Sequence, residues 1–171
     1  MGHLGRTFAY RGFTSSTGKT LARIVHKRCK HKAAEYVKKH SDVKAHVTNI
    51  KWQGLDGSWM SFDIDGRTLA DERAYLDATA QSYRHSFRSG ADLEERVEQH
   101  LAREKKRMAK SGSLSVYAQP RRYGWRAAVR IDIRDHGENV FEVEVQKDGD
   151  VPKEILRCLE SSYNEIRDKF G

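Results

Sequence analysis

Three features are scarce in this sequence, and each scarcity excludes a class of protein. The chain has two cysteines, Cys29 and Cys158, among 171 residues, too few for a disulfide framework and typical of an intracellular, reducing compartment. No run of 18 apolar residues occurs, so we expect no membrane-spanning helix. The first 40 residues contain one acid, Glu35. The cysteine content predicts a cytoplasmic location, whereas the acid-poor beginning also suits a mitochondrial presequence.

The composition predicts a folded chain with a modest core and a heavily charged surface. Charged residues make up 33% of it, against about 25% in average globular domains. Three Trp, seven Tyr and six Phe, together with clear hydrophobic periodicity, indicate that the chain folds. We expect a single domain, 1–171, in which 1–18 form an N-terminal arm or an edge strand.

Residues 19–40 predict an amphipathic helix with a strongly basic face. At 100° per residue an apolar stripe forms on one side, made of Leu21, Val25, Cys29, Ala33 and Tyr36. Five cations gather within a sector of about 100° on the opposite side, namely Lys19, Arg23, Lys27, Lys30 and Lys38. One face can therefore pack on a core while the other presents a row of positive charge.

The excess positive charge lies entirely in this first quarter. Residues 1–40 carry ten Lys and Arg against one acid, and residues 41–171 carry 22 against 23. A basic patch beside a near-neutral body is the electrostatic footprint of polyanion binding. We therefore predict a nucleic-acid-binding protein that contacts the phosphate backbone of DNA or RNA with little sequence specificity. The simpler alternative is a helix that only keeps the surface soluble.

A second basic and aromatic group follows Pro120, where one strand turns into the next. Arg121 and Arg122 can pair with phosphates, and Tyr123 or Trp125 can stack on an unpaired base. In the alternative interpretation Trp125 points into the core and the neighbouring arginines pair with acids across the sheet.

The order of elements predicts an α+β fold, (β)-α-β-β-α-α-β-β-β-α, with about five antiparallel strands and about four helices. A hairpin joins 43–52 to 59–65 around Gly54 and Gly57, and a capping-box-like start at Thr68 opens the next helix. The helix at 92–110 is followed by strands near 114–119, 125–134 and 140–147. Their alternation of apolar and charged residues is typical of a sheet covered on one side.

Two resemblances concern the C-terminal half. The order α-β-β-β-α resembles that of a double-stranded-RNA-binding domain, but the Lys-rich start of that family's final helix is replaced by the mostly acidic 150–154. Asp132 with Glu142 and Glu144 resembles the acidic hairpin of restriction-type nucleases, which would imply a divalent metal. A metal-dependent nuclease is therefore one alternative function.

The remaining alternative is a protein-binding module, an inhibitor or adaptor that docks the basic helix on an acidic partner. Composition alone does not separate a protein–protein interaction from nucleic-acid binding, because both use the same cationic face. The helical spacing of His26 and Cys29 is too weak a pattern for a zinc site. In the leading interpretation we expect no catalytic residue, metal or cofactor.

Overall fold

The computed structural model describes residues 3–10, 15–54, 57–87, 90–110, 114–115, 122–136 and 138–170. Its helices are α1 (Ser15–Lys39), α2 (Leu69–Ser86), α3 (Leu93–Met108) and α4 (Lys153–Phe170). Its strands are β1 (His3–Tyr10), β2 (Val43–Val47), β3 (Lys51–Gln53), β4 (Trp59–Thr68), β5 (Leu114–Ser115), β6 (Arg122–Tyr123), β7 (Trp125–His136) and β8 (Glu138–Asp148).

Six of these strands form one antiparallel sheet in the order β1-β8-β7-β4-β2, and β3 also pairs with β4. β2 pairs with residues 64–68 of β4 and β3 with residues 59–61, so the two short strands share one edge of β4. The sheet therefore has five strand positions. This confirms the predicted α+β fold with an antiparallel sheet and four helices.

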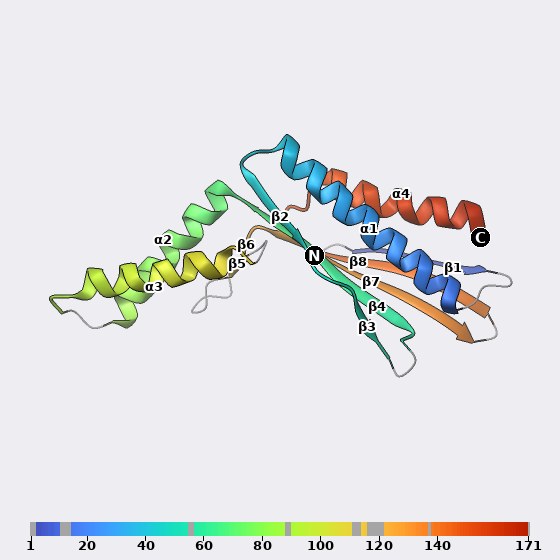
Figure 1. Ribbon diagram of the computed structural model, residues 1–171, viewed down its shortest axis with the longest axis horizontal. Helices are drawn as coiled ribbons and strands as arrows, with labels where there is room; N and C mark the ends of the chain where they lie inside the picture. The colour runs from blue at the N-terminus through green and yellow to red at the C-terminus, as the bar shows by residue number, and fades with distance from the viewer. Residues whose placement is uncertain are drawn as a thin grey trace.

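Helices α1 and α4 lie side by side over one face of the sheet (Figure 1). The core forms between them and the alternate residues of β4, β7 and β8 that point to that face, with Phe62, Val129 and Phe141 among the most buried. Alternation in the strands and a 3.6-residue repeat in the helices place these apolar side chains on facing surfaces. α1 thus packs on the sheet with its apolar side.

Helices α2 and α3 project away from the sheet as an antiparallel pair (Figure 1). A capping box starts α2, since the Thr68 side chain accepts from the Asp71 amide and Asp71 accepts from the Thr68 amide. The predicted start of this helix at Thr68 is confirmed. A second small cluster, Tyr75, Met108 and Leu114, packs where this arm joins the sheet.

Two predicted strands differ from the observed ones. The strand predicted at 43–52 is broken into β2 and β3. Of the strand predicted at 114–119, the described residues Leu114–Ser115 form β5, which pairs with β6 in a separate two-stranded sheet, and residues 116–120 fall outside the described residues. Within the described part of the chain, none of the helices combines the length and the apolar content that crossing a bilayer requires.

Candidate nucleic-acid interface

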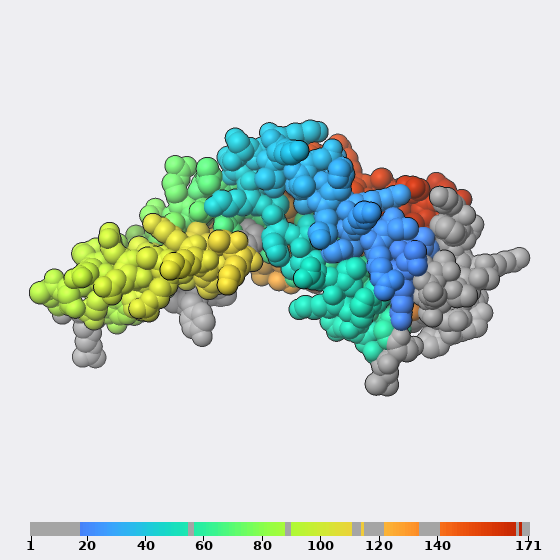
Figure 2. All heavy atoms as spheres, in the orientation of Figure 1, coloured from blue at the N-terminus to red at the C-terminus, as the bar shows by residue number. Residues whose placement is uncertain are grey.

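The predicted apolar stripe of α1 faces the sheet. Leu21, Val25, Cys29 and Ala33 are buried, while Tyr36 is half-buried near the end of the helix. Ala22 and His26 extend the buried side. The side of α1 that carries the cations is thereby turned to solvent, and Figure 2 shows the described part of the helix, in blue, running across the surface.

The five predicted cations lie along that outer side. Arg23, Lys27, Lys30 and Lys38 are exposed and Lys19 is half-buried. Among the described residues no carboxylate forms an ion pair with any of the five. Arg28, on a different side of the helix, does have such a partner in Glu165 of α4. The structure therefore keeps this row of charge unneutralised by the described acids.

An aromatic ring lies beside the N-terminal end of the row. The guanidinium carbon of Arg23 is 5.3 Å from the centre of the Trp52 ring, and Nζ of Lys19 is 5.8 Å from it. Trp52 pairs with Met60 across β3 and β4, so it points to the helix-covered face. Its ring is half-buried. Cations and a partly accessible ring thus meet at one place, which the sequence analysis did not predict.

His26 positions this edge of the sheet against α1. Its Nε2 donates to the carbonyl oxygen of Thr48, 2.9 Å away, and its ring meets the edge of Phe62. The Thr48 hydroxyl accepts from the Asp63 amide at 2.8 Å. These bonds lie in the break between β2 and β3. His26, considered above as a zinc ligand, instead ties the Trp52 edge to the helix.

The described residues of the second predicted group do not join this surface. Arg121 lies outside the described residues. Arg122 is paired with Asp148 at 2.9 Å, and Tyr123 meets Tyr75 with ring centres 5.9 Å apart. Trp125 is 6% exposed and belongs to the main core. As placed, Trp125 has no open ring face on which a base could stack.

The other face of the sheet carries acids and bases in similar number. Its described side chains include six acids and five bases, namely Asp63, Asp65, Asp132, Glu142, Glu144, Asp148, Lys44, Lys51, Arg67, Arg126 and Arg130. Arg130 stacks on Trp59 at 3.9 Å and contacts Asp132 on its own strand, rather than an acid across the sheet. In the described residues no three His, Cys, Asp or Glu side chains converge to hold a metal. The acidic hairpin thus lacks the cluster that the nuclease alternative requires.

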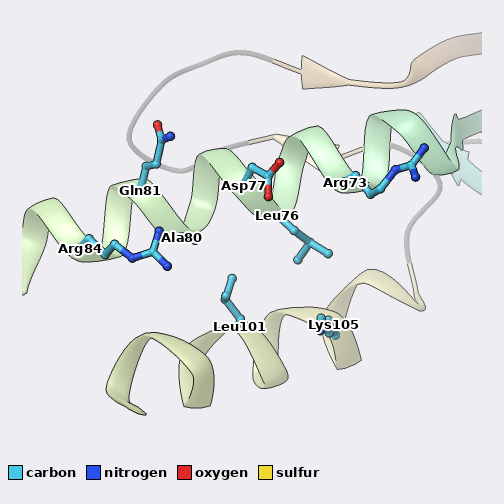
Figure 3. Close-up of a pocket in the computed structure, with 8 residues that line it drawn as sticks. All are labelled: Arg73, Leu76, Asp77, Ala80, Gln81, Arg84, Leu101 and Lys105. Carbon is cyan, nitrogen blue, oxygen red and sulfur yellow. The ribbon is translucent and has the colours of Figure 1, made fainter. Parts of the chain in front are cut away.

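A cleft of about 450 Å³ lies between α2 and α3 (Figure 3). Leu76 and Leu101 point toward each other across it, and its other lining side chains are Arg73, Asp77, Ala80, Gln81, Arg84 and Lys105. Arg84 pairs with Glu94 at 3.0 Å. The cleft therefore combines apolar packing with partly neutralised charge, unlike the outer side of α1.

Comparison of the chain with protein-family models, with curated proteins and with solved structures finds no match.

Proposed function

We propose that this protein binds nucleic acid through the outer side of α1, by contacts to the phosphate backbone and with little sequence specificity. The observation that carries the proposal is the row of cations at Lys19, Arg23, Lys27, Lys30 and Lys38, none of which is paired with a described carboxylate. Lysine and arginine side chains held in a row on a rigid helix match a chain of phosphates.

The distribution of charge favours this surface over the others. On the open face of the sheet the described acids and bases are similar in number, so that face has no excess of positive charge to attract phosphate. From Lys19 to Lys38 the helix advances by about 28 Å at 1.5 Å per residue. That length matches about eight nucleotides of one strand at about 3.4 Å per nucleotide. We expect oligonucleotides shorter than this to bind more weakly.

Trp52 favours a single-stranded ligand. Its ring lies beside Arg23 and Lys19, so a base that unstacks from its strand would find an aromatic surface next to two phosphate partners. Single-strand-binding proteins combine a cationic track with aromatic side chains in this way. A duplex, whose bases remain stacked on one another, would contact only the cations.

The salt dependence gives the first test. If all five cations contact phosphates of a duplex, log affinity falls against log salt with a slope of about −4.5. Between 50 and 200 mM salt, affinity then falls several-hundred-fold. Fluorescence anisotropy with labelled single- and double-stranded DNA and RNA measures both the slope and the preference for strandedness.

A matched pair of variants tests whether α1 is the binding surface. The triple variant Arg23→Glu, Lys27→Glu and Lys30→Glu should abolish binding. The control triple variant on α3, Arg103→Glu, Lys105→Glu and Lys106→Glu, makes the same change in net charge at three exposed positions. Equal losses in both triple variants would mean that net charge, rather than α1, drives binding, and the proposal would be rejected.

An acidic protein partner is the competing explanation, and Lys→Arg substitutions separate the two. A phosphate track tolerates replacing Lys27, Lys30 and Lys38 by Arg, and heparin competes for it, because the recognition is electrostatic. A specific protein interface instead fails on loss of one or two anchoring side chains. Retained binding of oligonucleotides by the Lys→Arg variant supports the nucleic-acid proposal.

A further inference from the structure

The two cysteines, 129 positions apart in the sequence, meet where α1 packs against α4. Cys29 lies on the buried side of α1 and is 1% exposed, whereas Cys158 on α4 is half-buried. Sγ of Cys158 is 3.8 Å from the carbonyl oxygen of Arg28, the residue before Cys29. The Cys158 thiol donates to this oxygen, so it lies beside the peptide bond that joins Arg28 to Cys29, across the contact between α1 and α4. Both cysteines are free thiols in this structure.

Cys158 is reached from solvent through two clefts. One, of about 490 Å³, lies between α1 and α4 and is lined in part by Lys27, His31 and Ser162. The other, of about 330 Å³, is lined by Glu154 and Arg157 in addition to Lys32, Cys158 and Ser161, which line both. A small solute therefore has access to Cys158 but not to the buried Cys29.

The surroundings of Cys158 favour its thiolate form, whereas those of Cys29 favour its protonated thiol. The neighbouring Cys29 thiol lowers the pKa of Cys158 to about 7, against the opposing effect of burial; Ser162 and the charges of Lys32 and Arg28 add to the lowering. The proximity of Cys158, together with burial, raises the pKa of Cys29. One sulfur is thus an accessible nucleophile and its neighbour is a protonated thiol.

We propose that Cys158 is an oxidation-sensitive site that reacts with hydroperoxides and that Cys29 resolves the product as a disulfide joining α4 to α1. The proposal rests on the placement of the two sulfurs, on the access to one of them and on the cations around it. It is independent of nucleic-acid binding, since Cys29 and Cys158 are not among the proposed phosphate contacts.

The chemistry balances with a hydroperoxide as the oxidant. The Cys158 thiolate attacks one peroxide oxygen, so that an S–O bond forms, the O–O bond breaks and the leaving oxygen takes a proton as an alcohol or water. Cys158 is then a sulfenic acid. The Cys29 sulfur, losing its proton, attacks the Cys158 sulfur, and the hydroxyl leaves with that proton as water. Two thiols and one hydroperoxide give one disulfide, one alcohol or water, and one water.

Disulfide formation brings the two sulfurs to about 2.05 Å from each other. Because both lie on packed helices, the disulfide would form within one chain. A reducing agent such as dithiothreitol would reverse it by thiol–disulfide exchange. The oxidised site is therefore a reversible modification.

The unmodified full chain provides the first test. After treatment with one equivalent of hydrogen peroxide, peptide mapping under non-reducing conditions should find Cys29 and Cys158 in one cross-linked peptide, within monomers. Phenylarsine oxide, which bridges neighbouring dithiols, should protect both cysteines from iodoacetamide. Disulfides only between chains, or no protection by the arsenical, would overturn the proposal.

Single variants then assign the two roles. In Cys29→Ser, oxidation should stop at a Cys158 sulfenic acid that dimedone traps. In Cys158→Ser, loss of the remaining thiol to peroxide should slow about tenfold or more, because Cys29 is shielded and protonated. Unchanged kinetics in Cys158→Ser would reject Cys158 as the attacking residue. Circular dichroism of each variant checks that it is folded, and the arsenical result on the unmodified chain stands if one is not.

Discussion

Arg28 of α1 and Glu165 of α4 form a bidentate ion pair, with Nη1 2.6 Å from one carboxylate oxygen and Nη2 2.9 Å from the other. This partner distinguishes Arg28 from the cations on the outer side of the same helix. Arg28 is engaged in holding α1 to α4, whereas the charge row on the outer side has no such partner among the described acids.

Replacing Arg28 by Gln should therefore cost little and leave binding intact. The side chains of Arg28 and Glu165 are 39% and 52% exposed, and pairs in such positions contribute about 0–1 kcal/mol. Because Arg28 is not a proposed phosphate contact, we expect the salt slope of oligonucleotide binding to stay the same. Urea unfolding and anisotropy measure the two effects. A shallower slope in this variant would show that Arg28 also contacts phosphate.

Gly66→Ala should destabilise the sheet. A Cβ at this position would lie 2.3 Å from Cζ2 of Trp125 and 2.9 Å from the carbonyl oxygen of Lys44. Forcing an extra carbon into a packed core costs about 1–3 kcal/mol. The control is Gly90→Ala, where the nearest atom, Oδ1 of Asp92, is 3.4 Å away. Equal urea midpoints for both variants would contradict the packing of Trp125 on Gly66.

Periodicity predicted the elements but not every partner. The apolar stripe from Leu21 to Ala33 and the alternation around Val129 were recognisable because both depend on spacing of a few residues. The absence of a side chain at Gly66 leaves space for Trp125 on the neighbouring strand. These residues are 59 positions apart, so no local pattern in the sequence indicates their contact. Trp125 was therefore open to two interpretations, and the structure places it in the core.

The candidate site was predictable to the same limited extent. The cations of α1 followed from helical spacing, but the position of Trp52 beside Arg23 depends on how β3 pairs with β4. The proximity of the two thiols could not be predicted from the sequence for the same reason. Cys29 was correctly predicted on the buried stripe, whereas the contact with Cys158 exists only because α1 and α4 pack together.

Arg67→Met should loosen the joint between the sheet and the α2–α3 arm. Arg67 is 1% exposed, with Nε 3.2 Å from Oε2 of Glu72 and Nη2 3.0 Å from the carbonyl oxygen of Met108. Methionine retains bulk but leaves the buried carbonyl without this donor. Removing one partner of a buried ion pair costs about 3–5 kcal/mol, and the partial exposure of Glu72 places the expected loss near about 3 kcal/mol.

The control for this variant is Arg73→Met, at an exposed position of α2, which should change stability by less than about 0.5 kcal/mol. Hydrogen exchange should show faster exchange of the α2 and α3 amides in Arg67→Met alone. Unchanged exchange there would mean that Arg67 does not hold the arm.

Acid should weaken the same joint. Burial opposes ionisation of Glu72, but hydrogen bonds from Arg67 and Lys44 outweigh it and lower the pKa. A hydrogen bond from Arg107 lowers the pKa of Glu104, helped by Tyr75 and opposed by burial. Both folded-state pKa values then lie below the unfolded value of about 4.3. The unfolded chain therefore binds more protons in this range, so the folded state becomes less stable as the pH is lowered.

We expect the contribution of these carboxylates to be fully present above the unfolded pKa and lost as pH falls through the folded values. Urea unfolding between pH 6 and pH 3 measures it. Glu104→Gln should flatten the acid limb of the stability curve, while Glu98→Gln, at an exposed position on the same helix, should not. An identical acid limb in Glu104→Gln and the unmodified chain would exclude Glu104 as a source.

Trp52→Ala separates base stacking from charge attraction. Stacking of a base on an aromatic side chain is worth about 1–3 kcal/mol, so we expect single-stranded oligonucleotides to bind the variant about fivefold or more weakly. Duplex and heparin affinities should change little, because the cations remain. Trp59→Ala is the control, since Trp59 stacks on Arg130 on the opposite face of the sheet. Equal affinities of both variants for single strands would contradict stacking on Trp52. If Trp52→Ala lowers the affinity for heparin as much as the affinity for single-stranded DNA, then the ring serves only to orient Arg23 and Lys19.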